Sequence, residues 1–118
     1  MDLKINGKDY PLSFGLDFIA ALDGKHYVEP NGIKLGQGLT AAVANIQLGN
    51  PTILIDLIQA ATITEKIKPT LLEIKTFIEN DVKDVEALMD DFFDAFTKAP
   101  MTKFLLKRIT TAAEQATQ

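Results

Sequence analysis

The stretch Asn50-Pro51-Thr52-Ile53-Leu54-Ile55-Asp56-Leu57-Ile58-Gln59-Ala60-Ala61 decides the fold of this chain. Asn50 is suited to cap a helix, and Pro51 is favoured at the first helical position because its missing N–H would be unpaired there anyway. The residues that follow, through Ile63, are apolar around most of a helical circumference. Such a helix normally lies at the centre of a domain. The sequence therefore predicts a central helix that begins at Pro51.

Five further segments have helical spacing of their apolar residues. They run from Gly15 to Leu22, from Leu39 to Leu48, from Thr70 to about Ile78, from Val85 to Thr97 and from Pro100 to Ala116. Asp23-Gly24 predicts the end of the first segment, and Gly49 is a candidate C-terminal cap of the second. Thr70 and Glu73 have the spacing of a capping box, in which each side chain bonds to the other residue's backbone.

The first fourteen residues alternate between apolar and polar positions, which is typical of strands. Asn6-Gly7 interrupts the alternation and predicts a β-hairpin, because a type I′ turn needs positive φ at both central residues. A lone two-stranded hairpin is marginal in water, so we expect its apolar face to lie on helices or its edge to pair with another edge.

These patterns predict a mainly α (α+β) fold. A β-hairpin over residues 2–14 precedes five or six packed helices over residues 15–116, in a single domain that spans residues 1–118. The stretch from His26 to Gly36 is rich in glycine, proline and asparagine, which indicates a loop. A brief strand at Ile33-Lys34-Leu35 is an open alternative there.

The composition favours a protein that binds other proteins. The chain is 47% hydrophobic, which is enough for a core, and its net charge of −4 works against binding nucleic acid. The absence of cysteine excludes disulfides, zinc ribbons and thiol catalysis. The N-terminus does not resemble a signal peptide, and no apolar run approaches the roughly 20 residues that span a bilayer, so we expect neither export nor membrane insertion. The charge is uneven: residues 79–96 contain seven acids and one lysine, whereas Lys98, Lys103, Lys107 and Arg108 follow.

No combination of residues points to catalysis. His26 is the only histidine and has no serine or second histidine near it in sequence, so we expect a surface or packing role. Ser13, the only serine, lacks the Gly-x-Ser-x-Gly pattern of a nucleophile elbow. We therefore predict that the chain is not an enzyme and has no catalytic residue.

Two other patterns fall short of a ligand site. Gly36-Gln37-Gly38 lacks the remaining residues of a phosphate-binding or dinucleotide-binding loop, and helix entry explains its glycines. Asp90, Asp91 and Asp94 do not have the spacing of a calcium loop and fall within a helical pattern, so a solvated helix face explains them better. We expect no cofactor and no metal ion.

A stripe of apolar residues marks the helix predicted for residues 85–97, which Asp84 would cap and Pro100 would follow. At about 100° per residue, the stripe falls within an arc of roughly 140°. It contains Leu88, Met89, Phe92, Phe93 and Phe96. Burial in the core is one explanation; a groove for a partner helix, with an acidic rim that suits a basic partner, is the other. We therefore regard these five residues as candidate partner-binding residues.

Several short patterns, taken in order, resemble the tail assembly chaperones of long-tailed (siphovirus-type) phages or prophages of Gram-positive bacteria. These patterns lie between about residues 3 and 80 and comprise Lys4–Tyr10, Phe14-Gly15 with Phe18 and Leu22, Gly36–Leu39, Leu48–Pro51 and Ile58 with Ala60-Ala61. Their order and spacing carry the resemblance, since each alone is common.

The resemblance implies a specific function. Such chaperones bind the tape measure protein, keep it soluble and help the tail tube to assemble around it. A longer, frameshifted form of the same chaperone, the tail-tube protein and further copies of the chain are the other implied partners. The place of action would be the cytoplasm of the host bacterium, and the protein would be absent from the mature virion.

The sequence leaves open an alternative function and also suggests a contact between subunits. A structural head–tail connector or minor tail protein, which stays in the virion, is the alternative function. The hairpin, with apolar Leu3, Ile5, Tyr10 and Leu12, is a candidate contact between subunits, because exposed strand edges pair readily.

Overall fold

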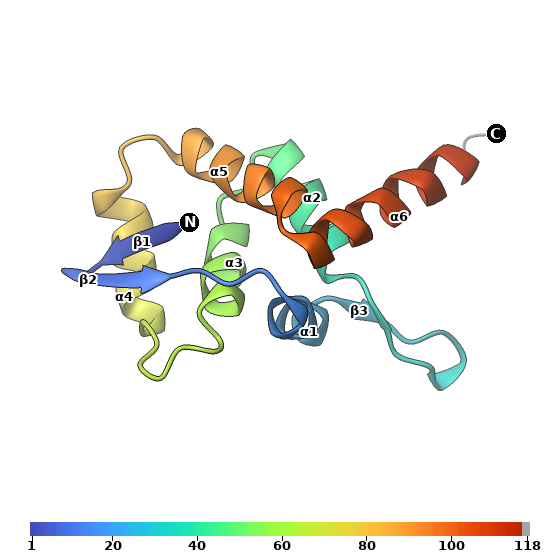
Figure 1. The fold of residues 1–118 in the computed structure, drawn as a ribbon, viewed down its shortest axis with the longest axis horizontal. Coiled ribbons are helices and arrows are strands. Elements are labelled where there is room, and N and C mark those ends of the chain that lie inside the picture. The colour runs from blue at the N-terminus through green and yellow to red at the C-terminus, as the bar shows by residue number, and fades with distance from the viewer. Residues whose placement is uncertain (117–118) are drawn as a thin grey trace.

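A β-hairpin and six α-helices make up most of the computed structural model, which describes the backbone of residues 1–116 and the side chains of residues 1–112 (Figure 1). The strands are β1 (Asp2–Ile5), β2 (Lys8–Pro11), β3 (Tyr27–Val28) and β4 (Leu35–Gly36). The helices are α1 (Leu16–Lys25), α2 (Gly38–Leu48), α3 (Ile53–Ala61), α4 (Leu71–Thr76), α5 (Val85–Lys98) and α6 (Pro100–Ala116), with a 3-10 turn at Pro30–Gly32 and a π-helical turn at Phe77–Asp81. The predicted mainly α fold with an N-terminal hairpin is confirmed. Residues 117–118 of the predicted domain lie outside the described part.

The N-terminal hairpin forms at the predicted turn. Asn6 and Gly7 both have positive φ, 51° and 76°, as a type I′ turn requires. Leu3 pairs with Tyr10 across the antiparallel strands, and this face of the hairpin is turned towards the hydrophobic core. Two hydrogen bonds hold the hairpin on helices: the Asn6 amide donates to Glu73 at 2.9 Å, and the backbone N–H of Ser13 donates to the Ala61 carbonyl at 2.9 Å.

Helix α3 is the central element, as its sequence predicts. Its buried residues are Ile53, Leu54, Leu57, Ile58, Ala60 and Ala61. The Asn50 side chain accepts hydrogen bonds from the backbone N–H of Thr52 at 3.2 Å and from its hydroxyl at 2.8 Å, as a helix cap does. The regular helix begins at Ile53 rather than at Pro51, because the backbone bonds of the first turn, such as Leu54 N–H to the Pro51 carbonyl, span three residues. This turn places Pro51 and Thr52 just before the helix.

Most predicted helix ends are confirmed by local hydrogen bonds. Gly49 caps α2 with φ of 73°, and the Thr70–Glu73 capping box is complete in both directions. The Asp84 carboxylate accepts the N–H of Ala87 at 3.0 Å at the start of α5. The predicted end of α1 at Asp23-Gly24 is wrong, since the helix continues to Lys25. The Asp23 side chain does not end its own helix because it binds the start of α2.

The stretch predicted as a loop after α1 is a second, short hairpin. Strands β3 and β4 pair antiparallel, with Val28 opposite Leu35. Asn31 and Gly32 both have positive φ, 55° and 78°, at the tip of this hairpin. The brief strand left open at Ile33-Lys34-Leu35 therefore exists, but it begins two residues later and comprises Leu35 and Gly36.

A sharp corner joins α5 to α6. Pro100 is the first residue of α6, and the buried Thr102 hydroxyl donates to the carbonyl oxygen of Phe96 at 2.9 Å. Because this bond satisfies a carbonyl at the end of α5, it stabilises the turn into α6. The far half of α6 projects from the globule, whose longest dimension is 48 Å (Figure 1).

The Glu73 carboxylate should make the stability of the fold depend on pH. The backbone N–H of Thr70 and then the side chain of Asn6 hold the pKa of Glu73 below its ordinary value of 4.5. A carboxylate with a lowered pKa in the fold stabilises it above that ordinary value, and the stabilisation is lost as the pH falls through the folded pKa. We expect Glu73→Gln to lower the free energy of unfolding at neutral pH, with a gap from the unmodified chain that narrows below about pH 4.5.

Urea denaturation at a series of pH values measures this gap. Glu79→Gln is the matched control, because the described residues give the Glu79 carboxylate no hydrogen-bond partner. An equal and pH-independent effect of both variants would contradict the assignment.

Candidate protein-binding surface

The stripe of α5 lies mostly in the core. Leu88, Met89, Phe92 and Phe96 are buried, and Phe92 and Phe96 have no exposed surface. Phe92 and Phe96 meet Phe14, the ring that follows the N-terminal hairpin, at centroid distances of 6.1 and 5.8 Å. Burial in the core, one of the two explanations of the stripe, therefore accounts for these four residues, which pack against the segment before α1.

Phe93 is the one stripe residue at the surface, with 37% of its area exposed. Its neighbours Asp90, Asp91 and Asp94 are exposed too, which agrees with a solvated acidic face. Asp94 forms an ion pair with Lys98 at 2.7 Å, and this bond raises the pKa of Lys98. Partner binding through Phe93 stays a prediction, whereas contact with the other four residues would require α5 to leave the core.

The candidate subunit contact on the N-terminal hairpin is also turned inward. Ile5 and Tyr10 are buried, and Leu3 and Leu12 are half-buried against the core. Packing on helices thus accounts for the apolar face of this hairpin. Contact with a neighbouring subunit remains a prediction, for which Leu3 and Leu12 supply the accessible surface.

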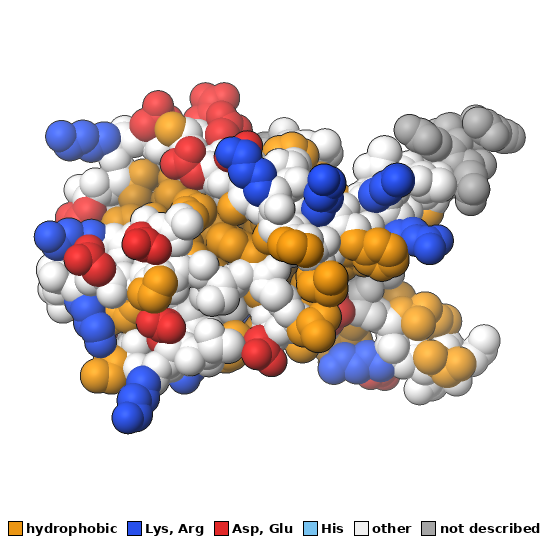
Figure 2. Space-filling model, viewed as in Figure 1, with side chains coloured by type: hydrophobic (Ala, Val, Ile, Leu, Met, Phe, Trp, Pro, Cys, Tyr) orange, Lys and Arg blue, Asp and Glu red, His pale blue; other side chains and the backbone are white. Residues whose placement is uncertain are grey.

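A more exposed apolar surface lies at the opposite end of the molecule. The β3–β4 hairpin (residues 27–36) and helix α6 project there as two arms, which we call the fork (Figure 1). Figure 2 shows hydrophobic side chains on both arms and a notch between them. The exposed apolar residues are Tyr27, Val28, Ile33 and Leu35 on the hairpin and Met101 and Phe104 on α6.

A groove runs between the bases of the two arms. We call it the fork groove; it has a volume of about 480 Å³ and is lined by Asp23, Gly36, Gln37, Gly38, Leu39, Thr40, Leu105, Arg108, Ile109 and Ala112. Leu105 and Ile109 are half-buried, so they leave an apolar strip of α6 open to the groove. Arg108 is the one cationic residue in this lining. Its guanidinium lies 5.4 Å from the centre of the Phe104 ring.

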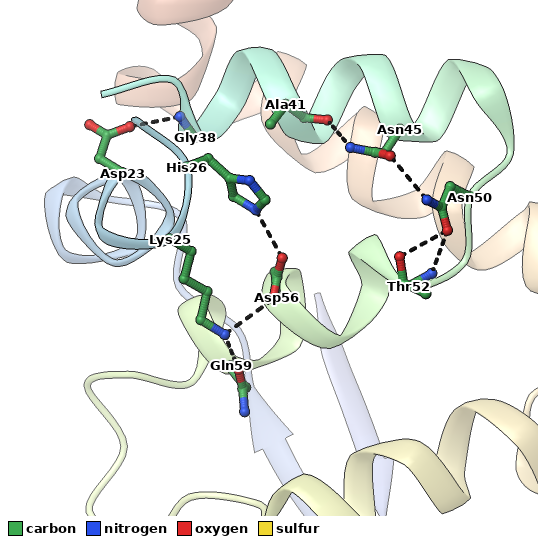
Figure 3. A network of polar contacts seen from close by, with 10 residues as sticks. All are labelled: Asp23, Lys25, His26, Gly38, Ala41, Asn45, Asn50, Thr52, Asp56 and Gln59. Carbon is green, nitrogen blue, oxygen red and sulfur yellow. Dashed lines mark hydrogen bonds and ion pairs between the residues drawn. The ribbon is translucent and has the colours of Figure 1, made fainter. Parts of the chain in front are cut away.

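Polar contacts fix the root of the hairpin arm to the core (Figure 3). Asp56 of α3 accepts from Lys25 at 3.1 Å and pairs with the Nε2 atom of His26 at 2.9 Å. Lys25 also donates to Gln59. The backbone N–H of Gln37 donates to the His26 carbonyl at 2.8 Å, which closes the hairpin at its base. His26 therefore has a structural contact at the root of the fork.

The floor of the groove depends on close backbone approach. The Asp23 carboxylate accepts the N–H of Gly38 at 2.9 Å and so caps the start of α2 (Figure 3). A Cβ atom on Gly38 would lie 2.5 Å from the Cβ of Leu22, and one on Gly36 would lie 2.2 Å from the Asp23 carboxyl carbon. Gly38 thus stands at the entry to α2, as the sequence suggests, and it also lets α1 and α2 approach closely.

The described residues give little support for other chemistry. Among them, no group of three or more histidine, cysteine or acidic side chains is placed to hold a metal ion. None of the described helices has the length and apolar character needed to cross a membrane. The fork combines exposed apolar side chains on two arms with a groove between their bases.

Sequence analysis missed the fork for two reasons. The Pro30–Gly32 turn indicates a loop, and loops give no sign of which side chains gather in space. The apolar residues of α6 do have helical spacing, but spacing alone does not separate a buried strip from an open one. The usable signal was the four apolar residues in the loop-like segment, Tyr27, Val28, Ile33 and Leu35, which a plain surface loop does not need.

Comparison with known families identifies the class of protein. The family model described as phage tail assembly chaperone protein, TAC, matches residues 2–110. Because the match covers nearly all of the sequence, the chain belongs to the phage tail assembly chaperone family. The resemblance found between residues 3 and 80 is thereby confirmed. No match was found among the curated proteins or among the solved structures compared with the chain.

Aspartate in place of Phe92 should destabilise the fold far more than aspartate in place of the adjacent Phe93. Phe92→Asp buries a carboxylate in the aromatic core, so we expect a loss of about 4 kcal/mol or more in the free energy of unfolding, or no folded protein. Phe93→Asp places the charge at the surface, so we expect a folded chain with a change of about 1 kcal/mol or less. Circular dichroism with urea denaturation compares the two variants; equal losses would show that Phe93 also lies in the core.

Proposed function

We propose that this chain binds the tape measure protein of its phage, keeps it soluble and helps the tail tube to assemble around it. Membership of the tail assembly chaperone family supports a role in tail assembly. The observation that carries the proposed binding is the fork, where apolar side chains on two projecting arms face solvent. Large apolar patches on a small protein usually mark a surface that binds a partner.

The arrangement of the fork suits a helical client. The groove is lined by one side of a 17-residue helix, and helix faces commonly receive partner helices through residues spaced three and four apart. The hairpin arm gives a second apolar surface, so that a bound helix is covered from two sides. A chaperone of this kind acts by covering apolar surface, and its function requires no catalytic residue.

The other implied partners belong to the same proposal. The longer frameshifted form, further copies of this chain and the tail-tube protein would meet the client complex in the host cytoplasm. Phe93 and the hairpin residues Leu3 and Leu12 are the accessible candidates for contacts between subunits. Displacement of the chaperone by the polymerising tube would leave it out of the virion.

Co-expression with the tape measure protein of the same phage tests the binding. We expect the client to become soluble and to co-purify with the unmodified chain. The double variant Ile33→Asp/Phe104→Asp should lose most of this effect, because it places a charge on each arm of the fork. Both side chains are exposed, by 62% and 57%, so the variant should stay folded.

Leu72→Asp is the matched control, since Leu72 is 74% exposed on α4, away from the fork. If the client stays insoluble with the unmodified chain and with its longer form, the proposed function is wrong. If the client is solubilised equally by all variants, the binding surface lies elsewhere on the chain.

Composition of the finished particle separates a chaperone from the alternative, a head–tail connector or minor tail protein. We expect mass spectrometry of purified virions to detect tube and tape measure proteins but not this chain. Lysates of infected cells, in which the chain should be abundant, serve as the positive control for its detection. Stoichiometric amounts of the chain in virions would support the structural alternative.

A further inference from the structure

The fork combines apolar exposure with positive charge, in a chain whose net charge is −4. Between Lys98 and Ala113 the sequence contains four basic residues and no acid. Lys103, Lys107 and Arg108 are exposed on α6, and Lys34 is exposed on the hairpin arm. The local charge of this end is therefore opposite to the charge of the whole chain.

The acids near the fork are fewer than its cations. On α6, Glu114 follows the four basic residues in the sequence. Glu29 is the one acid of the hairpin arm. Asp23 lines the groove, but its carboxylate is already bound to the N–H of Gly38 at the positive end of α2. At the root, Asp56 is shared between Lys25 and His26. Arg108, in contrast, stands in the groove wall beside apolar Leu105 and Ile109, and no carboxylate forms an ion pair with it among the described residues.

Arg108 constrains what the groove accepts. A purely apolar partner that covered the groove would remove water from the guanidinium and leave an unpaired charge, which is costly. A carboxylate on the partner would remove this cost, because the planar guanidinium binds carboxylates through two parallel hydrogen bonds.

We propose that the fork groove binds an amphipathic helix whose apolar stripe is flanked by Glu or Asp, with one carboxylate paired to Arg108. The apolar stripe covers Leu105 and Ile109, and the acidic flank lies beside Arg108 at the edge of this strip. This inference rests on the proposed function, because the helix is a segment of the tape measure protein. It adds the chemistry of the segment, which family membership does not give.

Synthetic peptides test the charge of the partner apart from the client. Two fluorescently labelled helical peptides share one leucine stripe and differ only in flanks of Glu or of Lys. We expect the full chain to bind the Glu peptide about tenfold or more tighter than the Lys peptide by fluorescence anisotropy. Added salt should weaken the binding of the Glu peptide, since the flanking charges are exposed. A third peptide, with Glu flanks and serine in place of leucine, should not bind.

Charge reversal in the groove is the matching test on the protein. Arg108→Glu should weaken the binding of the Glu peptide about tenfold or more and should abolish the preference over the Lys peptide. Lys83→Glu, which changes the net charge equally at an exposed position between α4 and α5, should leave both affinities unchanged. Urea denaturation of each variant establishes that the fold is retained.

Four results would overturn the inference. Equal affinity for the two flanked peptides, or equal effects of Arg108→Glu and Lys83→Glu, would show that the groove does not select acidic helices. Self-association of the chain in analytical ultracentrifugation that Arg108→Glu abolishes would show that a second copy is the occupant, since α5 is itself acidic and carries Phe93. If the client is solubilised but neither peptide binds, the proposed function stands and this inference fails.

Discussion

Four phenylalanine rings join the N-terminal part of the chain to α5, and the rest of the fold depends on their packing. They are Phe14, Phe18, Phe92 and Phe96. Phe14 and Phe18 meet at 5.0 Å between centroids, and Phe18 reaches Phe96 at 5.6 Å. Aromatic pairs of this geometry contribute about 0.5–1.5 kcal/mol each beyond the area they bury. The backbone carbonyl oxygen of Phe96 also accepts a hydrogen bond from the Thr102 hydroxyl. A residue of the aromatic cluster therefore fixes the corner between α5 and α6. One arm of the fork therefore starts from this buried aromatic cluster.

The other arm is fixed in a different way, by carboxylates. Asp56 comes from the central helix and binds Lys25 and His26 at the root of the hairpin, while Asp23 holds the start of α2 beside it. Both roots are thus attached to core helices. The exposed apolar side chains lie along the hairpin arm and, on α6, in its first two turns. Because exposed side chains make few core contacts, these positions are free to suit a partner at little cost in stability.

Local signals in the sequence were enough to predict most helices, strands and turns. Contacts between segments that are distant in the sequence could not be predicted from them. Asn6-Gly7 determines its turn, and the Thr70 and Asp84 caps lie within three residues of their partners, so each was predictable. The burial of the α5 stripe was not, because it depends on Phe14, about eighty residues earlier in the chain. The fork was missed for the same reason: its groove exists only where the β4–α2 connection lies against α6.

The net charge of the chain does not describe the charge around the fork groove. A net charge of −4, together with the acids around α5, suggests that the protein attracts basic partners. Salt screens exposed charges beyond about 8–10 Å, however, so a bound segment responds mainly to the residues that surround it. In the fork groove the charged residues are Arg108 and Asp23, and the Asp23 carboxylate is already bound to the N–H of Gly38. The proposed acidic segment is therefore matched to Arg108 and not to the net charge of the chain.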